Sequence, residues 1–242
     1  MAGPKTLRAL GRLLCYPDEQ TVESAELLYI ILMGEFPEAA TEIAVFGAFL
    51  EQRELWEAEE EFTRTFDVNP ACALEVGWHL FGEEYARGMF LVRMREELRK
   101  YNLTESAELP DHVVHVLDVI GAMPDDEASR FVKACVLPAV LKMHAALEGT
   151  GRPYSNVVSC LATILHRVWG EGEMLTDGSE SAHPDGNAIP SDVDLLHAFP
   201  VAGVQGGCDE SGCSDGGCGS SGDDHELVQL TINDNPARRD ER

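Results

Sequence analysis

The sequence predicts an all-α protein, with a single helical-bundle domain over residues 1–170 and a largely disordered acidic tail over residues 171–242. In the first part, apolar residues recur at intervals of three and four, and no stretch alternates with a period of two for long enough to indicate a strand. The second part holds 11 of the 22 glycines, one Phe and no Trp or Tyr. Such a composition cannot bury enough apolar surface to offset the entropy lost on ordering.

Proline and glycine mark the ends of the expected helices, because neither residue continues a helix well. The main boundaries fall at Pro17, Pro37, Pro70, Pro124 and Gly149–Gly151. Seven helices are predicted in chain order, at 4–15, 19–34, 37–66 with a possible break, 74–101, 109–123, 125–147 and 153–169. Pro138 lies inside the sixth and is expected to kink it.

The charge is strongly negative, with 43 acidic residues against 18 basic ones and a net charge of −25. About half of the excess of acidic residues lies in residues 171–242, which make up less than a third of the chain. Binding to nucleic acid or to an anionic lipid surface needs clustered Lys and Arg, so neither partner is expected. The longest apolar run covers residues 27–33, far short of the roughly 20 residues that span a bilayer, and no secretory signal is evident. A cytoplasmic protein without membrane insertion is expected.

The helix expected at 74–101 carries charge on its apolar side. A row at helical spacing joins Leu80, Glu84, Arg87, Leu91, Met94, Leu98 and Tyr101. Arg87 either pairs with Glu83 or Glu84 one turn back, or lines a groove together with these acids. Gly82 and Gly88 each cost about 1 kcal/mol relative to Ala, which favours close approach of another backbone or a peptide to this helix.

The helix expected at 109–123 has a strong start, since Pro110 suits the first helical position and Asp111 suits the positive end of the helix dipole. His112 and His115 are three residues apart and Asp111 lies four before His115, so a metal site is conceivable. Ordinary capping is the favoured interpretation, because no known metal framework accompanies these residues.

Three of the seven cysteines, Cys208, Cys213 and Cys218, lie five residues apart in a Gly/Ser-rich stretch of the tail. This spacing matches no recognised zinc motif, and an incidental role in a flexible tail is favoured over metal binding. The alternative is a metal-binding or metal-handling protein that uses these cysteines with His112 and His115. The other four cysteines are expected to be buried thiols.

Two tail segments are candidates for docking on another surface. Residues 191–199 begin with a helix-capping Ser and an acidic first turn, and residues 227–232 have an extended pattern. Neither of these two segments is expected to be stable alone. The acidic tail could also fold over a groove of the helical domain and compete with the ligand of that groove.

No catalytic motif is evident: the chain lacks a P-loop, a dinucleotide fingerprint, a nucleophile elbow and a recognisable Cys/His/Asp set. A helical domain with a charged groove and no catalytic constellation suits a binding protein better than an enzyme.

Four segments, in order, carry a resemblance to a known family. They are RLLCYPD at 12–18, EFTRTFD at 61–67, HLFGEEYARGM at 79–89 and ELPDH at 108–112, with a faint further match, LTIN, at 230–233. Together they resemble the nitrate reductase molybdenum cofactor assembly chaperones, the NarJ branch of the redox enzyme maturation proteins that also includes TorD and DmsD. The branch also serves related molybdenum enzymes, so the client stays open between nitrate reductase and a close relative.

The resemblance implies an all-helical, non-enzymatic chaperone that binds the N-terminal segment of a molybdenum enzyme's catalytic subunit. It further implies that the chaperone assists insertion of the molybdenum cofactor, which it does not hold stably, before membrane docking or export. Cofactor biosynthesis proteins are further candidate partners. The client peptide is expected at the residues that match the family's third and fourth segments, namely His79, Gly82, Glu83, Glu84, Arg87, Gly88, Glu108, Asp111 and His112.

Overall fold

The computed structural model describes residues 3–170. All regular elements in this part of the chain are helical, apart from one isolated antiparallel bridge between Glu75 and His112. The predicted all-α class is therefore confirmed. The described residues belong to the first of two compact units, 1–202. The predicted acidic tail, its cysteines and the expected boundary after residue 170 lie outside the described residues.

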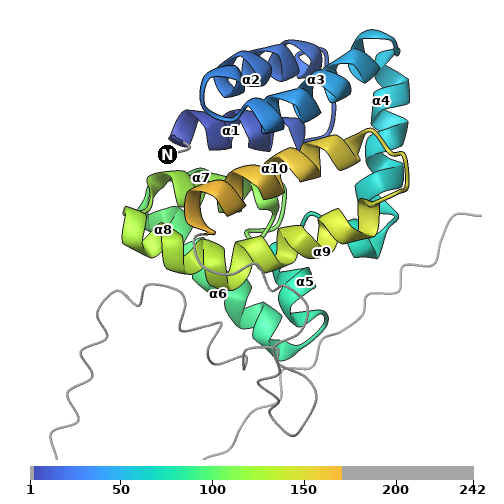
Figure 1. The fold of residues 1–242 in the computed structure, drawn as a ribbon. Coiled ribbons are helices and arrows are strands. Elements are labelled where there is room, and N and C mark those ends of the chain that lie inside the picture. The colour runs from blue at the N-terminus through green and yellow to red at the C-terminus, as the bar shows by residue number, and fades with distance from the viewer. Residues whose placement is uncertain (1–2, 171–242) are drawn as a thin grey trace, which may run out of the picture. The chain divides into compact units, whose positions relative to one another are not determined.

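The helices follow one another closely, with π-helices at η1 and η3 and a 3-10 helix at η2 (Figure 1). Their bounds are α1 (Pro4–Leu13), α2 (Thr21–Glu35), α3 (Pro37–Glu51), α4 (Leu55–Phe62), η1 (Thr63–Asp67), η2 (Pro70–Cys72), α5 (Val76–Phe81), α6 (Tyr85–Lys100), α7 (Val113–Ala122), α8 (Asp125–Phe131), η3 (Val132–Val136), α9 (Leu137–Leu147) and α10 (Tyr154–Trp169). The first, second and last helices agree with the sequence prediction to within two residues. The possible break in 37–66 is confirmed, and Glu57 caps the start of α4 by accepting a hydrogen bond from the backbone N–H of Glu54 at 3.0 Å.

The prediction of one helix over 74–101 is wrong, because the chain forms two helices, α5 and α6, with a break at residues 82–84. Gly82 has a φ of 57°, in the left-handed region that only glycine adopts readily, and it ends α5. Glu84 is extended and starts α6. The two helices therefore do not share the single stripe expected from the sequence.

The prediction that Pro110 opens a helix is also wrong, since α7 begins three residues later, at Val113. The preceding turn instead hydrogen-bonds to the chain before α5. The Val76 N–H donates to the carbonyl of Asp111 at 2.9 Å, and the Val113 N–H donates to the carbonyl of Leu74 at 2.8 Å. Pairing with a segment more than thirty residues away thus replaces the first helical turn.

The helix expected at 125–147 is confirmed, because α8, η3 and α9 follow one another without a break over those residues. The π-helix η3 lies between α8 and α9, and Pro138 occupies the second position of α9. Proline has no N–H, and its ring clashes with the carbonyl four residues earlier in an α-helix. The wider π turn accommodates both effects within the continuous helix, and such turns are a usual place for a helix to bend.

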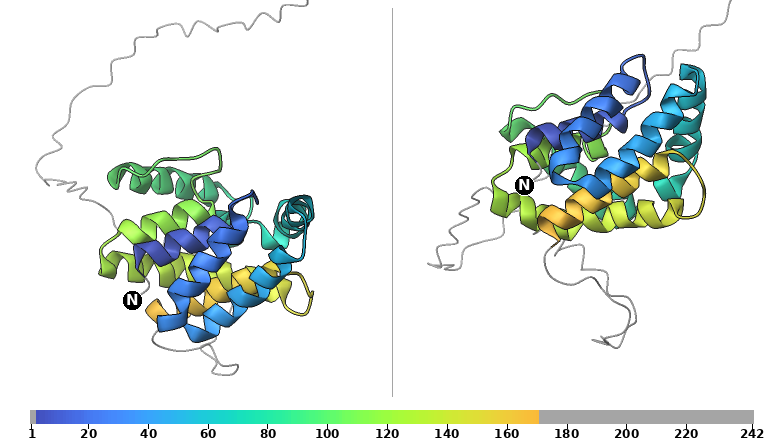
Figure 2. Two further views of the ribbon diagram at one scale, coloured as in Figure 1. Left: turned by 90° about the horizontal axis from the view of Figure 1, so that it is seen from above. Right: turned by 45° about the horizontal axis from the view of Figure 1, so that its top comes forward.

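The last helix, α10, lies at the centre of the core, where it packs between α3 and α9 and also contacts α1 (Figure 1, Figure 2). Tyr154, at its start, is fully buried and meets three aromatic rings. The ring centroids of Phe46, Phe62 and Phe66 lie 4.9, 5.5 and 5.2 Å from that of Tyr154. Among the described residues, no helix is long and apolar enough to cross a bilayer.

The Tyr154 hydroxyl has no hydrogen-bond partner among the described residues, so its burial costs free energy without compensation. We expect Tyr154→Phe to leave the free energy of unfolding unchanged or to raise it by up to about 1 kcal/mol. Tyr154→Ala is expected to lower it by about 4 kcal/mol, through loss of the aromatic packing. Urea denaturation of both variants checks this, and a loss above about 1 kcal/mol in Tyr154→Phe would contradict it.

Candidate functional site

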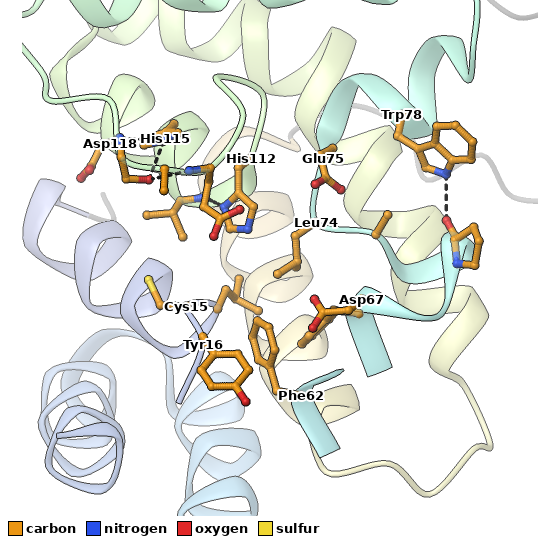
Figure 3. Close-up of a pocket in the computed structure, with 18 of the residues that line it drawn as sticks. Cys15, Tyr16, Phe62, Asp67, Leu74, Glu75, Trp78, His112, His115 and Asp118 are labelled. Atoms are coloured by element: carbon orange, nitrogen blue, oxygen red, sulfur yellow. Dashed lines mark hydrogen bonds between the residues drawn. The ribbon is translucent and has the colours of Figure 1, made fainter. Parts of the chain in front are cut away.

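A large groove, here called the main groove, has a volume of about 950 Å³ (Figure 3). Segments far apart in the sequence form its walls. The lining residues are Leu14, Cys15 and Tyr16 after α1, Phe62 at the end of α4, Phe66 and Asp67 on η1, Pro70, Ala73, Leu74, Glu75 and Trp78 around the start of α5, Arg87 on α6, and Thr104, Ser106, Ala107, Glu108, His112, Val114, His115 and Asp118 before and on α7.

One part of the main groove is aromatic. The rings of Tyr16 and Phe62 meet edge to face with centroids 5.6 Å apart, and Phe62 meets Phe66 in the same way at 5.0 Å. Phe62 and Phe66 are buried, whereas 53% of Tyr16 is exposed, so Tyr16 offers an open apolar surface at the edge of the groove. Such a surface can bury the apolar side of a ligand.

Four carboxylates line the same groove, from Asp67, Glu75, Glu108 and Asp118. Arg87 is the only Lys or Arg among the lining residues. The groove therefore combines an apolar wall with an excess of negative charge, an arrangement that attracts a ligand with both apolar and basic groups.

Asp111 is completely buried directly behind the main groove. Its Oδ2 accepts a hydrogen bond from the backbone N–H of Gly77 at 3.1 Å and lies 3.6 Å from Nε of Arg87. Burial raises the pKa of the Asp111 carboxyl, and the Arg87 charge opposes this shift. Asp111 thus ties α5, α6 and the turn before α7 to one another.

Arg87 reaches from this buried carboxylate to the groove. Its guanidinium lies 5.6 Å from the centre of the Trp78 ring, within the range of a cation–π contact. The indole N–H of Trp78 in turn donates to the carbonyl of Pro70 at 2.8 Å (Figure 3). Of the two alternatives for Arg87, pairing with Glu83 or Glu84 is wrong among the described residues, because Arg87 pairs with Asp111. Arg87 does line a groove, although Glu83 and Glu84 do not line it with Arg87.

The two histidines at the start of α7 each have a local hydrogen-bond partner. His112 caps α7, since its Nδ1 accepts a hydrogen bond from the Val114 N–H at 3.3 Å. Burial, together with the neighbouring His115, lowers the pKa of His112 to about 4. Nε2 of His115 lies 3.1 Å from the Ser106 hydroxyl. These contacts agree with the capping interpretation of His112.

The residues expected to bind a client peptide fall into three groups. Arg87, Glu108 and His112 line the main groove, and Asp111 lies behind it. His79 supports the groove wall, with Nε2 2.6 Å from the carbonyl oxygen of Ala73, a lining residue. The remaining four lie at the break between α5 and α6 or just after it and do not line the groove: Gly82, Glu83, Glu84 and Gly88.

The expectation that another backbone approaches Gly82 and Gly88 is not supported within the described residues, because an added Cβ would meet nothing within 4 Å at either position. Gly77, by contrast, is tightly packed. A Cβ there would lie 2.6 Å from Oδ2 of Asp111 and 3.0 Å from a ring carbon of Phe90.

Five further residues line the main groove that the sequence does not mark as site residues: Tyr16, Phe62, Glu75, Trp78 and Asp118. The sequence does hold a signal for two of them, because Tyr16 and Phe62 lie in segments 12–18 and 61–67, which also carry the family resemblance. Ordered motifs that meet at one groove are a stronger indication of function than any of them alone.

Metal binding gains no support from the part of the chain that the structure describes. Within residues 3–170, no group of three or more His, Cys, Asp or Glu side chains is placed to hold a metal ion. Asp111 contacts Gly77 and Arg87 rather than His115. The candidate ligands Cys208, Cys213 and Cys218 lie outside the described residues.

Comparison with known proteins gives one family and several relatives. The family described as nitrate reductase delta subunit matches residues 34–156, about half of the chain. The nitrate reductase molybdenum cofactor assembly chaperone NarJ of Escherichia coli (strain K12) is 23% identical over 180 residues, which cover 73% of this chain and 76% of NarJ. The probable chaperone NarW of the same strain is 28% identical over 123 residues, or 50% of this chain and 52% of NarW.

Proposed function

Because the chain belongs to the nitrate reductase delta subunit family, we propose that it is an assembly chaperone for a molybdenum oxidoreductase. Its client is the catalytic subunit of nitrate reductase or of a close relative. The chaperone binds that subunit in the cytoplasm and assists insertion of the molybdenum cofactor before membrane docking or export. Its role is to bind and not to catalyse a reaction, in keeping with relatives that are named as assembly chaperones.

The observation that carries this proposal is the combination of an aromatic wall and four carboxylates in the main groove. An amphipathic segment with Arg or Lys on one side and apolar residues on the other would satisfy both features. We propose that the N-terminal segment of the catalytic subunit binds here. Tyr16 and Phe62 would take its apolar side, and Glu75 and Glu108 its basic residues.

The same charges argue against stable binding of the cofactor in this groove. The molybdenum cofactor carries phosphate. Asp118 is paired with Arg8 and Arg87 with Asp111, but Asp67, Glu75 and Glu108 form no ion pair among the described residues, so the groove repels an anion. The chaperone would therefore act on the cofactor indirectly, by holding the client in a form that can receive it. Cofactor biosynthesis proteins remain further candidate partners in this step.

Peptide titration calorimetry tests the groove with the full chain and a peptide of the client's N-terminal segment. We expect Glu75→Lys combined with Glu108→Lys to weaken binding about 10- to 100-fold, because two attractive contacts become repulsive. The matched control reverses two exposed charges on α3, Glu38→Lys and Glu51→Lys, and should leave affinity within about twofold.

Equal affinity of the groove variant and the α3 control would refute the assignment of the main groove. A third variant, Glu83→Lys with Glu84→Lys, tests whether the break between α5 and α6 belongs to the site, because both residues are exposed there. Co-purification of the molybdenum enzyme's large subunit with the wild-type chain tests the client relationship itself.

A further inference from the structure

A second groove, here called the α1–α2 groove, lies between the first two helices and has a volume of about 470 Å³. Its charge is opposite to that of the main groove, since three basic residues and no acidic one line it. The lining residues are Pro4, Lys5, Arg8, Ala9 and Arg12 on α1 and Ser24, Leu27 and Ile31 on α2. In a chain with a net charge of −25, a basic apolar groove is an exception that calls for an acidic ligand.

Further apolar residues are exposed on α2. Leu27, Ile30 and Met33 are 54%, 68% and 56% exposed, and none of them contributes to the core of the described residues. Val22 and Tyr29 on the same helix are each 37% exposed. At helical spacing Leu27 and Ile30 lie on the side of α2 that also carries the groove-lining Ile31, whereas Val22, Tyr29 and Met33 lie on another side. Leu27, Ile30 and Ile31 therefore offer an apolar surface next to the bases of α1.

The basic residues are available to a ligand to different degrees. Lys5 is exposed and forms no ion pair within residues 3–170. Arg8 is also exposed and contacts Asp118 at 3.3 Å through Nε, and Arg12 pairs with Asp18. A guanidinium has five N–H donors, so one such contact leaves others for a second carboxylate.

We propose that residues 191–199 of this same chain dock in the α1–α2 groove. Within this segment, Leu195, Leu196 and Phe199 share one side at helical spacing, and Asp192 and Asp194 fall in the first turn after the capping Ser191. The apolar side matches Leu27 and Ile31 on α2, and the two aspartates match the bases on α1. A helix of this length is not stable alone in water, so it needs a surface of this kind to form.

The length of the chain permits this contact. The described part ends at Gly170, after α10, which touches α1. Residues 171–190 then supply 20 residues, and a chain of that length reaches up to about 70 Å when extended. A tethered segment also binds at high effective concentration, so a modest contact area suffices.

Charge decides between the two grooves. The tail 171–242 carries 16 acidic and 3 basic residues, so the four carboxylates of the main groove repel it and the bases of the α1–α2 groove attract it. On this proposal, residues 191–199 therefore dock in the α1–α2 groove instead of competing with a client in the main groove.

Zero-length cross-linking with a carbodiimide tests this contact in the full chain, because the reagent joins amines to carboxylates in direct contact. The chain has only four lysines, Lys5, Lys100, Lys133 and Lys142, which makes the product pattern simple to assign by mass spectrometry. We expect a link from Lys5 to Asp192 or Asp194. The link between Lys100 and Glu127, 3.1 Å apart, serves as the internal positive control.

Two matched variants separate docking from chance encounters. Leu27→Asp places a charge in the groove and should reduce the Lys5 link about tenfold. Val45→Asp on α3 alters a residue with the same exposure, 54%, and should leave the link unchanged. Both positions are exposed, so neither variant is expected to unfold the protein.

Three outcomes would overturn the proposal. One is the absence of a Lys5 link to residues 191–199 while the Lys100 control forms. Another is a link that persists equally in Leu27→Asp. The third is a link that joins light and ¹⁵N-labelled chains in a mixed sample, which would assign the groove to a second copy. None of these outcomes bears on client binding in the main groove.

Discussion

Gly77→Ala is expected to lower the free energy of unfolding by about 3 kcal/mol, which for a domain of this size lowers Tm by about 6–12 °C. The added Cβ would lie 2.6 Å from Oδ2 of Asp111, where the carboxylate accepts its hydrogen bond from the Gly77 N–H. Asp111 is fully buried and cannot move into solvent. Displacing it also separates it from Arg87, and a buried charge without its partner is strongly destabilising.

Gly88→Ala is the matched control, since it makes the same chemical change eleven residues along the chain. Gly88 is exposed within α6, and nothing lies within 4 Å of an added Cβ. We expect this variant to gain about 0.5–1 kcal/mol from the better helix propensity of alanine. Urea denaturation followed by circular dichroism should therefore show changes of opposite sign, and changes of the same sign would contradict the packing at Gly77.

A double variant tests whether the cost of Gly77→Ala arises from the contact with Asp111. Asp111→Ala removes the carboxylate that the new Cβ would strike, so Gly77→Ala should cost less in that background than in the wild type. Additive effects would mean that Gly77 and Asp111 do not meet. Because Asp111 holds Arg87 at the groove wall, Gly77→Ala should also weaken binding of the client peptide, whereas Gly88→Ala should not.

Acidification is expected to destabilise the protein through His112 by about 3 kcal/mol in total. Burial lowers the pKa of His112 to about 4, against an ordinary value of 6.5 that it regains on unfolding. Between these two pH values the unfolded chain binds a proton and the folded chain does not, so unfolding becomes more favourable as the pH falls. The structure explains why the ring must stay neutral, since Nδ1 accepts the hydrogen bond from Val114 at the positive end of α7.

The measurement compares the wild type with His112→Asn over the pH range from 7 to 4.5. Asparagine caps helices well and does not titrate in this range, so the variant removes the titration while retaining an acceptor. Burial raises the pKa of Asp111 and of Glu97, which opposes the effect of His112 on acidification in both proteins and cancels in the difference. Parallel pH profiles for the two proteins would show that His112 titrates normally in the folded state.

Local signals were sufficient to predict much of the fold. Pro37 marks the start of α3, and Pro153 immediately precedes α10, because proline fixes a chain conformation wherever it occurs. Gly82 shows the limit of this approach. A glycine within a helical pattern is usually tolerated, and only the φ of 57° reveals that the helix ends there.

The site was less predictable, because it depends on contacts between distant segments. Asp111 has the pattern of a helix-opening residue, and its burial follows from pairing with Leu74–Gly77, which no local pattern encodes. Tyr16 follows the helix predicted at 4–15, and Phe62 has the pattern of an ordinary residue of an amphipathic helix, so no local pattern marks either residue as part of a site. They become a groove wall only when the segment after α1 meets the end of α4.

The position of Tyr154 has a consequence for the order of events during translation. Phe62 and Phe66 line the main groove and pack on Tyr154, which begins the last described helix. A nascent chain that has emerged only as far as α9 contains every residue lining the main groove but lacks the ring that holds two of them in place. On the proposed function, competence to bind a client in the main groove would thus arise only when the ribosome has nearly completed the domain.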